Sequence, residues 1–207
     1  MILNGAPRSG KTSVARALQA REPGVWVNLG VDASQRILPE RYQPGIGLRP
    51  GGERPDLEPL VASLYAALFD SVAAHARMGL HVVLDVGLHD EYAEPLGAVP
   101  GAARRLRGLP VLLVGVHCPV EVIWERRRAT WGQPVESADD ELIAAVERWQ
   151  RAVHVGATYD LEVDTSRLTP EQCAESIADR LVGPPGTALW AWAGAEETMH
   201  DPPSSPS

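Results

Sequence analysis

The sequence contains little cysteine, no excess of positive charge and no histidine pairs at metal-ligand spacing. Cys118 and Cys173 are its two cysteines and lie far apart, which favours reduced, buried thiols over a disulfide framework or a cysteine-based metal site. The net charge of −8 argues against a general attraction to nucleic acid or to an anionic membrane. The six histidines show no spacing suited to a metal ion, so none of them is assigned to chemistry.

Long hydrophobic runs are also missing. The longest apolar run, residues 109–116, is far too short to cross a bilayer, and no cationic start followed by a long apolar stretch opens the chain. We therefore expect a cytoplasmic protein that binds neither nucleic acid nor membrane. The 207 residues, 44% of them hydrophobic, fit one domain of ordinary size, and they leave a homo-oligomer open.

What the sequence does contain is a phosphate-binding loop. Residues 5–12 match every fixed position of the pattern G-x-x-x-x-G-K-[ST], between a short apolar stretch and a helix-forming segment. The glycines allow a tight turn whose N–H groups surround phosphate oxygens at the positive end of the following helix. In this pattern Lys11 reaches the β- and γ-phosphates and the Thr12 hydroxyl ligates Mg²⁺. The motif therefore predicts ATP and Mg²⁺ as cofactors, with the nucleotide held by Gly5, Ala6, Pro7, Arg8, Ser9, Gly10, Lys11, Thr12 and Ser13.

Strand-like and helix-like segments alternate along the chain. A helical pattern covers residues 57–72, another follows Ser137-x-x-Asp140, and a capping box at 169–172 precedes a third. Alternation of this kind predicts an α/β fold built from right-handed βαβ units, with a five-stranded parallel sheet and helices on both faces. The expected strands are residues 2–4, 25–31, 80–86, 109–116 and 159–163.

Two segments fall outside this alternation. Residues 36–56 are rich in proline and glycine, and we expect them to form an irregular flap on the acceptor side of the site. Residues 183–207 are expected to form a disordered tail without a packed element, which limits the folded domain to 1–182. The flap carries four arginines: Arg36, Arg41, Arg49 and Arg54.

Two aspartates end predicted strands, at the sheet edge where ligands of parallel α/β folds bind. Asp85 follows an apolar strand and is a candidate to support Mg²⁺, directly or through water; the alternative is a carboxylate that caps a helix or bonds to a loop. Asp32 leads into the flap and is a candidate general base that takes the proton of an attacking hydroxyl. The alternative for Asp32 is a cap of the helical turn at 33–37.

A cluster of arginines follows the fourth predicted strand, within a segment at about 125–137 that is typical of a lid. An arginine that closes over a triphosphate neutralises charge on the transferred group. Arg126, Arg127 and Arg128 cannot all face inward, because neighbouring residues on a helix differ by about a hundred degrees. A purely structural role for this cluster, solvated or paired with nearby acids, stays open.

These motifs together resemble the chloramphenicol phosphotransferases. The similarity extends to about Leu181 and includes the phosphate loop, Leu29-Gly30-Val31-Asp32, Val83-Leu84-Asp85, residues 114–118 and residues 159–166. The resemblance implies a P-loop kinase-like fold and transfer of phosphate from Mg·ATP to a hydroxyl of an antibiotic, which inactivates it. It also implies that Asp32 is the catalytic base and Arg127 the lid arginine.

Two other functions remain open at this point. The flap arginines would suit a metabolite kinase of the shikimate, gluconate or nucleotide type, whose acceptor is anionic. A regulatory module that binds ATP without transferring phosphate is the alternative outside the enzymes.

Overall fold

The computed structural model describes residues 1–43, 54–89, 91–92, 95–131 and 140–194 of the chain. Five strands form one sheet in the order β2-β3-β1-β4-β5, and every pairing is parallel, as the alternation predicts. All strands therefore end at the same edge of the sheet, where residues that follow them meet. The strands are β1 (Ile2–Asn4), β2 (Trp26–Gly30), β3 (His81–Val86), β4 (Leu113–His117) and β5 (Leu161–Asp164).

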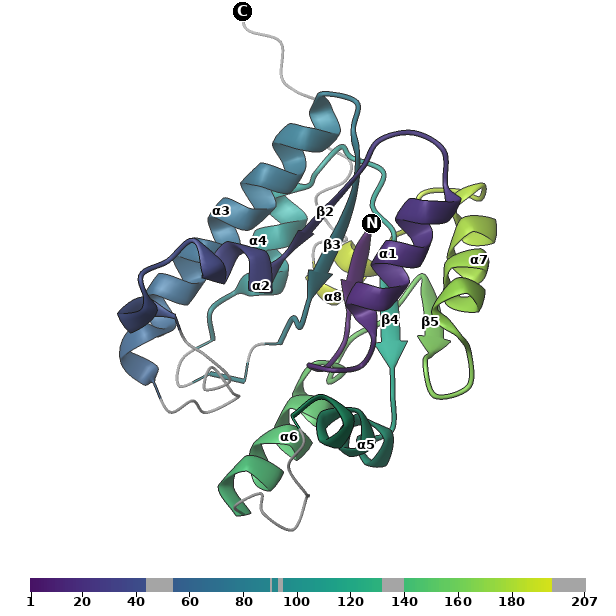
Figure 1. Ribbon diagram of the computed structural model, residues 1–207. Helices are drawn as coiled ribbons and strands as arrows, with labels where there is room; N and C mark the ends of the chain where they lie inside the picture. The colour runs from purple at the N-terminus through teal and green to yellow at the C-terminus, as the bar shows by residue number, and fades with distance from the viewer. Residues whose placement is uncertain (44–53, 90, 93–94, 132–139, 195–207) are drawn as a thin grey trace, which may run out of the picture.

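Helices cover both faces of the sheet (Figure 1). One face carries α1 (Lys11–Arg21) and α7 (Pro170–Leu181), which pack on each other, and the other carries α3 (Glu58–Arg77), α4 (Ala98–Arg105) and α8 (Ala188–Trp192). The remaining helices are α2 (Val31–Arg36), which follows β2 directly, and the pair α5 (Val120–Trp131) and α6 (Asp140–Ala152) beyond the carboxyl ends of the strands. Short 3₁₀ turns occupy Glu40–Tyr42 and Pro55–Leu57.

The buried core is divided between the two faces by the strand period of two. In β1, Ile2 belongs to the cluster under α3, α4 and α8, while its neighbour Leu3 belongs to the cluster under α1 and α7. Leu84 and Val83 of β3 are divided in the same way. Because both faces are covered, the strands read as continuous apolar runs, which is typical of parallel sheets.

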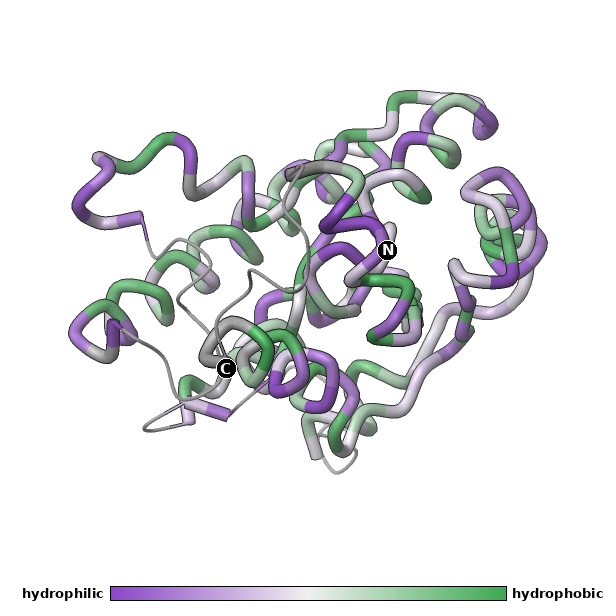
Figure 2. The backbone as a smooth tube through the Cα atoms, turned by 60° about the horizontal axis from the view of Figure 1, so that its bottom comes forward, coloured by the Kyte–Doolittle hydropathy of each residue, from purple (hydrophilic) through white to green (hydrophobic). Residues whose placement is uncertain are grey.

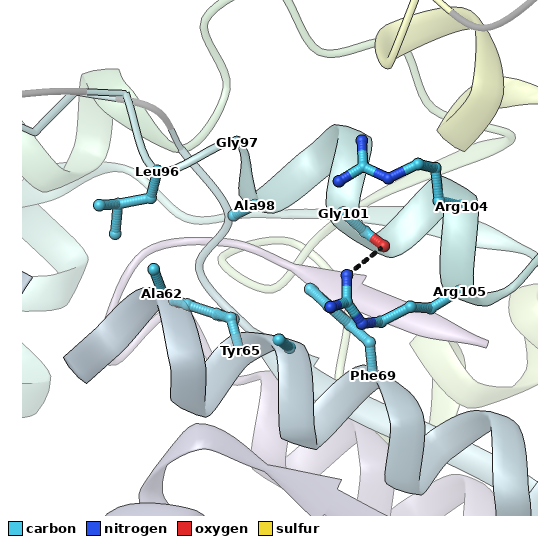
Figure 3. Close-up of a pocket in the computed structure, with 10 residues that line it drawn as sticks. Ala62, Tyr65, Phe69, Leu96, Gly97, Ala98, Gly101, Arg104 and Arg105 are labelled. Carbon is cyan, nitrogen blue, oxygen red and sulfur yellow. Dashed lines mark hydrogen bonds between the residues drawn. The ribbon is translucent and has the colours of Figure 1, made fainter. Parts of the chain in front are cut away.

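Helix α3 is long and apolar enough, by length and composition alone, to cross a membrane. In the fold it buries Val61, Leu68, Phe69 and Val72 in the cluster on one face of the sheet. Figure 2 shows polar residues interspersed with apolar ones along the outer helices. This pattern fits helices that pack one side on the sheet and expose the other side to water.

The structure corrects two expectations about the chain. The fourth strand begins at Leu113 instead of Leu109, because residues 106–109 form a turn closed by the bond from Leu109 N to Leu106 O, and the strand pairing starts only at Leu113. The segment after residue 183 does form a packed element: α8 buries Ala188 and Leu189 against the core. Residues 195–207 of the expected tail lie outside the described part of the chain.

Candidate active site

A cavity of about 1040 Å³ opens at the carboxyl edge of the sheet. Its walls come from the phosphate loop, the start of α1, helices α2 and α3, the end of β3, and helices α5 and α6. The cavity therefore brings together segments far apart in sequence, at the position where parallel α/β folds bind their ligands.

The phosphate loop has the backbone that its glycines permit. Gly10 has φ of 99° and is the N-cap of α1, and Arg8 has φ of 70°, the one positive value outside glycine among the described residues. A Cβ on Gly5 would collide with the carbonyl oxygen of Val116 on β4. Gly5 therefore lets the loop lie close against the sheet.

Lys11 is the only lysine in the sequence, and it is buried at the centre of the loop. Its Nζ donates to the carbonyl oxygens of Gly5 and Ala6 at 2.8 and 2.9 Å and lies 3.6 Å from Oδ1 of Asp85. Burial lowers the pKa of Lys11, while the charges of Asp85 and Asp32 act in the opposite direction. The amine is thus held beside carboxylates and carbonyls, in a position to meet a phosphate.

Thr12 and Asp85 meet at the mouth of the cavity. The Thr12 hydroxyl donates to Oδ2 of Asp85 at 2.6 Å, so the predicted pair of Mg²⁺ ligands lies together. Asp85 is placed there by the sheet register, which sets it beside Leu3 and Gly30. Hard oxygen donors of this kind suit Mg²⁺, which is usually held by one or two carboxylates together with substrate phosphates.

Ser9 gives a second indication that a polar ligand belongs in the loop. Its side chain is 1% exposed, and its Oγ has no hydrogen-bond partner among the described residues. A buried hydroxyl without a partner is unfavourable by about 1–3 kcal/mol. Ser9 does not line the cavity itself, so it marks unused hydrogen-bonding capacity beside Lys11 and Thr12, which do line it and fit a nucleoside triphosphate.

Asp32 lies in the first turn of α2 and lines the same cavity as Lys11 and Asp85. The expected strand of residues 25–31 ends at Gly30, so Asp32 is the second residue of a helix instead of the end of a strand. Its carboxylate acts on the Lys11 amine through its charge. Asp32 is exposed to solvent and lines the cavity.

The three arginines of the expected lid differ in their environments. Arg128 is exposed, as the prediction that they cannot all face inward requires, and Arg127 is buried, lines the cavity and lies over the Trp124 ring at 5.7 Å. Arg126 is the one that joins the phosphate loop: its Nη1 donates to the Arg8 carbonyl at 3.2 Å. Residues 132–139, which include most of the expected lid loop, lie outside the described residues.

Arg126 and Thr165 form a contact that motif spacing did not predict. Nη2 of Arg126 donates to the Thr165 carbonyl at 2.7 Å, and the Thr165 hydroxyl donates to the Ser9 carbonyl at 2.6 Å. Thr165 follows β5, so helix α5, the end of β5 and the phosphate loop are held together. The sequence shows that an arginine of the expected lid can donate to a carbonyl. It does not show which of the three adjacent arginines does so.

Buried polar groups also support the floor of the site. Asn4, at the end of β1, donates from Nδ2 to the Val153 carbonyl at 2.7 Å and to the Tyr159 hydroxyl at 3.0 Å, and its Oδ1 accepts from Leu88 N at 2.6 Å. The network fixes the end of β1, immediately before the phosphate loop, to the segments after β3 and α6. Neither its spacing nor its residue types form a recognisable motif.

The parallel sheet, its covering helices and the phosphate loop together define a P-loop kinase-like fold. Three solved structures share the fold. The tunicamycin resistance protein of Deinococcus radiodurans is 23% identical, with a TM-score of 0.54 over 87% of this chain and 94% of that one. Shikimate kinase of Aquifex aeolicus is 20% identical, with a TM-score of 0.53 over 88% and 95%. A sugar kinase of a Janibacter species is 19% identical, with a TM-score of 0.55 over 87% and 92%.

The chain belongs to the chloramphenicol phosphotransferase-like protein family, whose model matches residues 1–182. A Mycobacterium tuberculosis protein described as "Putative O-phosphotransferase" is 25% identical over 197 residues, covering 86% of this chain and 79% of that protein. The resemblance read from the motifs is thereby confirmed, and so is the P-loop kinase-like fold.

Proposed function

We propose that the protein is an ATP-dependent O-phosphotransferase that phosphorylates a hydroxyl group of a small molecule. One observation carries the proposal: Lys11, Thr12, Asp85 and Asp32 all line one cavity at the phosphate loop. Mg²⁺ would be held by Thr12 and Asp85 and would supply charge neutralisation at the phosphates. The ATP supply of the cytoplasm makes a cytoplasmic location part of this proposal.

In this proposal Asp32 is the general base. Its carboxylate is exposed within the cavity, so an acceptor hydroxyl can reach it and transfer its proton as phosphate is attacked. Asp32 is on α2, a different element from the phosphate loop, and both line one cavity of about 1040 Å³ that an acceptor and a triphosphate would share. The alternative role, capping of a helical turn, is not supported by any hydrogen bond of Asp32 to a described residue.

Arg127 is proposed to stabilise charge on the transferred phosphoryl group. It is buried and lines the cavity, and a guanidinium in a water-poor site interacts strongly with developing negative charge. Arg126 has a separate, positioning role, because it already donates to loop and β5 carbonyls. The proposal therefore keeps Arg127 as the charge-stabilising arginine and adds Arg126 as a residue that positions the phosphate loop.

Two classes of acceptor fit this chemistry. Family membership favours a chloramphenicol-like antibiotic, and the apolar wall formed by Val61, Tyr65, Tyr92 and Trp149 offers a surface for such a ring. The cationic side chain of Arg36 on the same cavity favours an anionic metabolite instead. In either case the reaction joins the hydroxyl oxygen to the γ-phosphorus and releases ADP.

Substitution Asp32→Asn tests the proposal. It keeps the size of the side chain and removes its basicity, so we expect the rate of phosphate transfer to fall by about 10²–10⁴ while Mg·ATP binding is retained. Transfer is measured as phosphorylated product by mass spectrometry, and Mg·ATP binding by calorimetry.

The matched control is Asp179→Asn, an exposed aspartate on α7, which should leave both quantities unchanged. Undiminished turnover in Asp32→Asn would remove Asp32 from the base role. ATP binding without any phosphorylated product in the unaltered protein would favour the regulatory module.

A further inference from the structure

Arg36 lies where it can distinguish one acceptor from another. It is the last residue of α2 and follows Asp32 by four positions, so the two side chains project from the same face of the helix with Cβ atoms about 5–6 Å apart. Both residues line the cavity. A molecule whose hydroxyl is at Asp32 therefore has its next few atoms beside the Arg36 guanidinium.

The other flap arginines are placed differently. Arg36 and Arg41 are both exposed, but Arg41 stacks on the Tyr42 ring at 4.7 Å, and Arg54 pairs with Asp56 at 2.8 Å. Neither lines the described part of the cavity, and Arg49 lies outside the described residues. Arg36 makes no ion pair or hydrogen bond with another described residue, so its charge is available to a ligand.

The charge of the cavity also indicates an anionic acceptor. The chain carries a net charge of −8, yet the described wall of the cavity has six cationic side chains and two carboxylates, an excess of four positive charges. The other five cationic side chains belong to the phosphate loop, α1 and α5, the elements proposed to surround the triphosphate, whereas Arg36 is on α2, beside the proposed base. The cationic residues are Arg8, Lys11, Arg16, Arg36, Arg126 and Arg127.

The remaining wall beside α2 is apolar and aromatic. Helix α3, which packs against α2, contributes Val61 and Tyr65, and Tyr92 completes this side. The Tyr65 hydroxyl donates to the Gly87 carbonyl at 3.4 Å, which directs its ring and not a free donor toward a ligand. A small carbon skeleton fits against this wall, while its charged substituent pairs with Arg36.

We infer that the acceptor is a hydroxy acid, a small molecule that presents its hydroxyl to Asp32 and a carboxylate or phosphate to Arg36. The inference rests on the proposed function and chooses between its two acceptor classes. A guanidinium offers paired N–H donors that match the oxygens of such a group. The Arg36 guanidinium is exposed to solvent, and an uncharged antibiotic offers it no charged partner, which favours an acid over that class.

The test uses pairs of acceptors that differ in the acid. The probes are shikimate with its methyl ester and D-gluconate with D-glucose, and chloramphenicol is the neutral antibiotic. For the unaltered protein we expect kcat/KM at least tenfold higher for an acid than for its neutral counterpart, measured as ADP release and confirmed as product by mass spectrometry. Substitution Arg36→Gln should reduce this ratio about tenfold, mainly through KM of the acid, and Arg36→Lys should restore part of it.

Arg41→Gln is the matched control, because Arg41 belongs to the same segment but lies outside the described cavity wall, and it should keep the ratio of the unaltered protein. Equal or better use of the neutral compounds, or a ratio that Arg36→Gln does not change, would overturn the hydroxy-acid inference alone. Mg·ATP binding without phosphorylation of any probe would instead count against the phosphotransferase itself, and against this inference with it.

Discussion

At the scale of single residues, His89 shows how burial sets the behaviour of a side chain next to the site. It is 2% exposed, stacks on Tyr92 with ring centroids 4.3 Å apart, and meets the edge of Trp149 at 4.7 Å. Tyr92 and Trp149 both line the cavity, so His89 supports the aromatic part of its wall from behind. Nδ1 accepts from Glu91 N at 3.2 Å, which places the proton of the neutral ring on Nε2.

The burial of His89 predicts that the protein loses stability as the pH falls. Desolvation lowers the pKa of His89 to about 4 from 6.5, so the unfolded chain binds the proton more readily between these values. Stability from the neutral ring is present above pH 6.5 and is lost as the pH falls toward 4, with a slope of at most about 1.4 kcal/mol per pH unit. The free energy of unfolding, measured with urea at each pH between 4 and 7, should change less steeply with pH for His89→Gln than for the unaltered protein.

Measurements above pH 7.5 provide the control for the comparison of His89→Gln with the unaltered protein. Between pH 7.5 and 8.5 the ring is neutral in both the folded and the unfolded state, so the two proteins should differ there by a constant free energy of unfolding. His154, whose pKa burial also lowers to about 4, contributes to the slope that remains in the variant. Parallel curves across the whole range would contradict the prediction for His89.

At the scale of elements, the helix that sequence reasoning missed depends on one carboxylate. Asp160 lies just before β5 and accepts from Leu113 N at 2.8 Å, from Thr187 N at 2.8 Å and from Ala188 N at 3.1 Å. It therefore joins the amino end of β4 to the first turn of α8. Gly186 makes this possible, because a Cβ there would collide with the Asp160 carboxylate.

Removal of this carboxylate should destabilise the protein. Asp160→Ala leaves three backbone donors without their acceptor, and we expect the free energy of unfolding to fall by about 2–4 kcal/mol. Asp179→Ala, an exposed aspartate on α7, should change it by less than about 0.5 kcal/mol. Urea unfolding measures both, and equal stability of the two variants would show that α8 does not depend on Asp160.

The same elements show what a sequence can predict here. Apolar runs and caps predicted five parallel strands and the helices between them, and the Thr169 capping box is present with both of its bonds. These signals are local. Helix α8 was missed because its first backbone donors bond to Asp160, which is distant in sequence, and its N-cap residue Thr187 makes no side-chain cap bond.

The site likewise contains residues that local motifs predict and contacts that only tertiary packing determines. The phosphate loop, Asp85 and Asp32 were predicted from local motifs, and the structure places both aspartates and all of the loop except Ala6 and Ser9 on one cavity. The contact of Arg126 with Thr165 depends on how α5 packs beside β5, and three adjacent arginines give no local reason to choose between them. The separation of Arg36 from the other flap arginines likewise follows from tertiary placement.

At the scale of the whole molecule, ligand binding and folding are linked through the contact of three segments. The Thr165 hydroxyl donates to the Ser9 carbonyl and accepts from Arg126 at 3.1 Å, so β5, α5 and the phosphate loop share one set of bonds. A ligand that binds the folded protein stabilises it, by about 2.7 kcal/mol at one hundred times its dissociation constant. A change at Thr165 should therefore affect both intrinsic stability and the gain from Mg·ATP.

Substitution Thr165→Val keeps the shape of the side chain and removes the hydroxyl. We expect the free energy of unfolding without ligand to fall by about 1–2 kcal/mol, because the Ser9 carbonyl and Arg126 lose a partner. The loosened loop should bind Mg·ATP about tenfold more weakly, which reduces the stabilisation at a fixed, saturating concentration by about 1.4 kcal/mol. Thr187→Val, at an exposed residue away from the cavity whose hydroxyl makes no cap hydrogen bond, should change neither quantity. Urea unfolding with and without Mg·ATP separates the two effects, and a Thr165→Val protein with the full ligand-induced gain would show that the loop holds its shape without this contact.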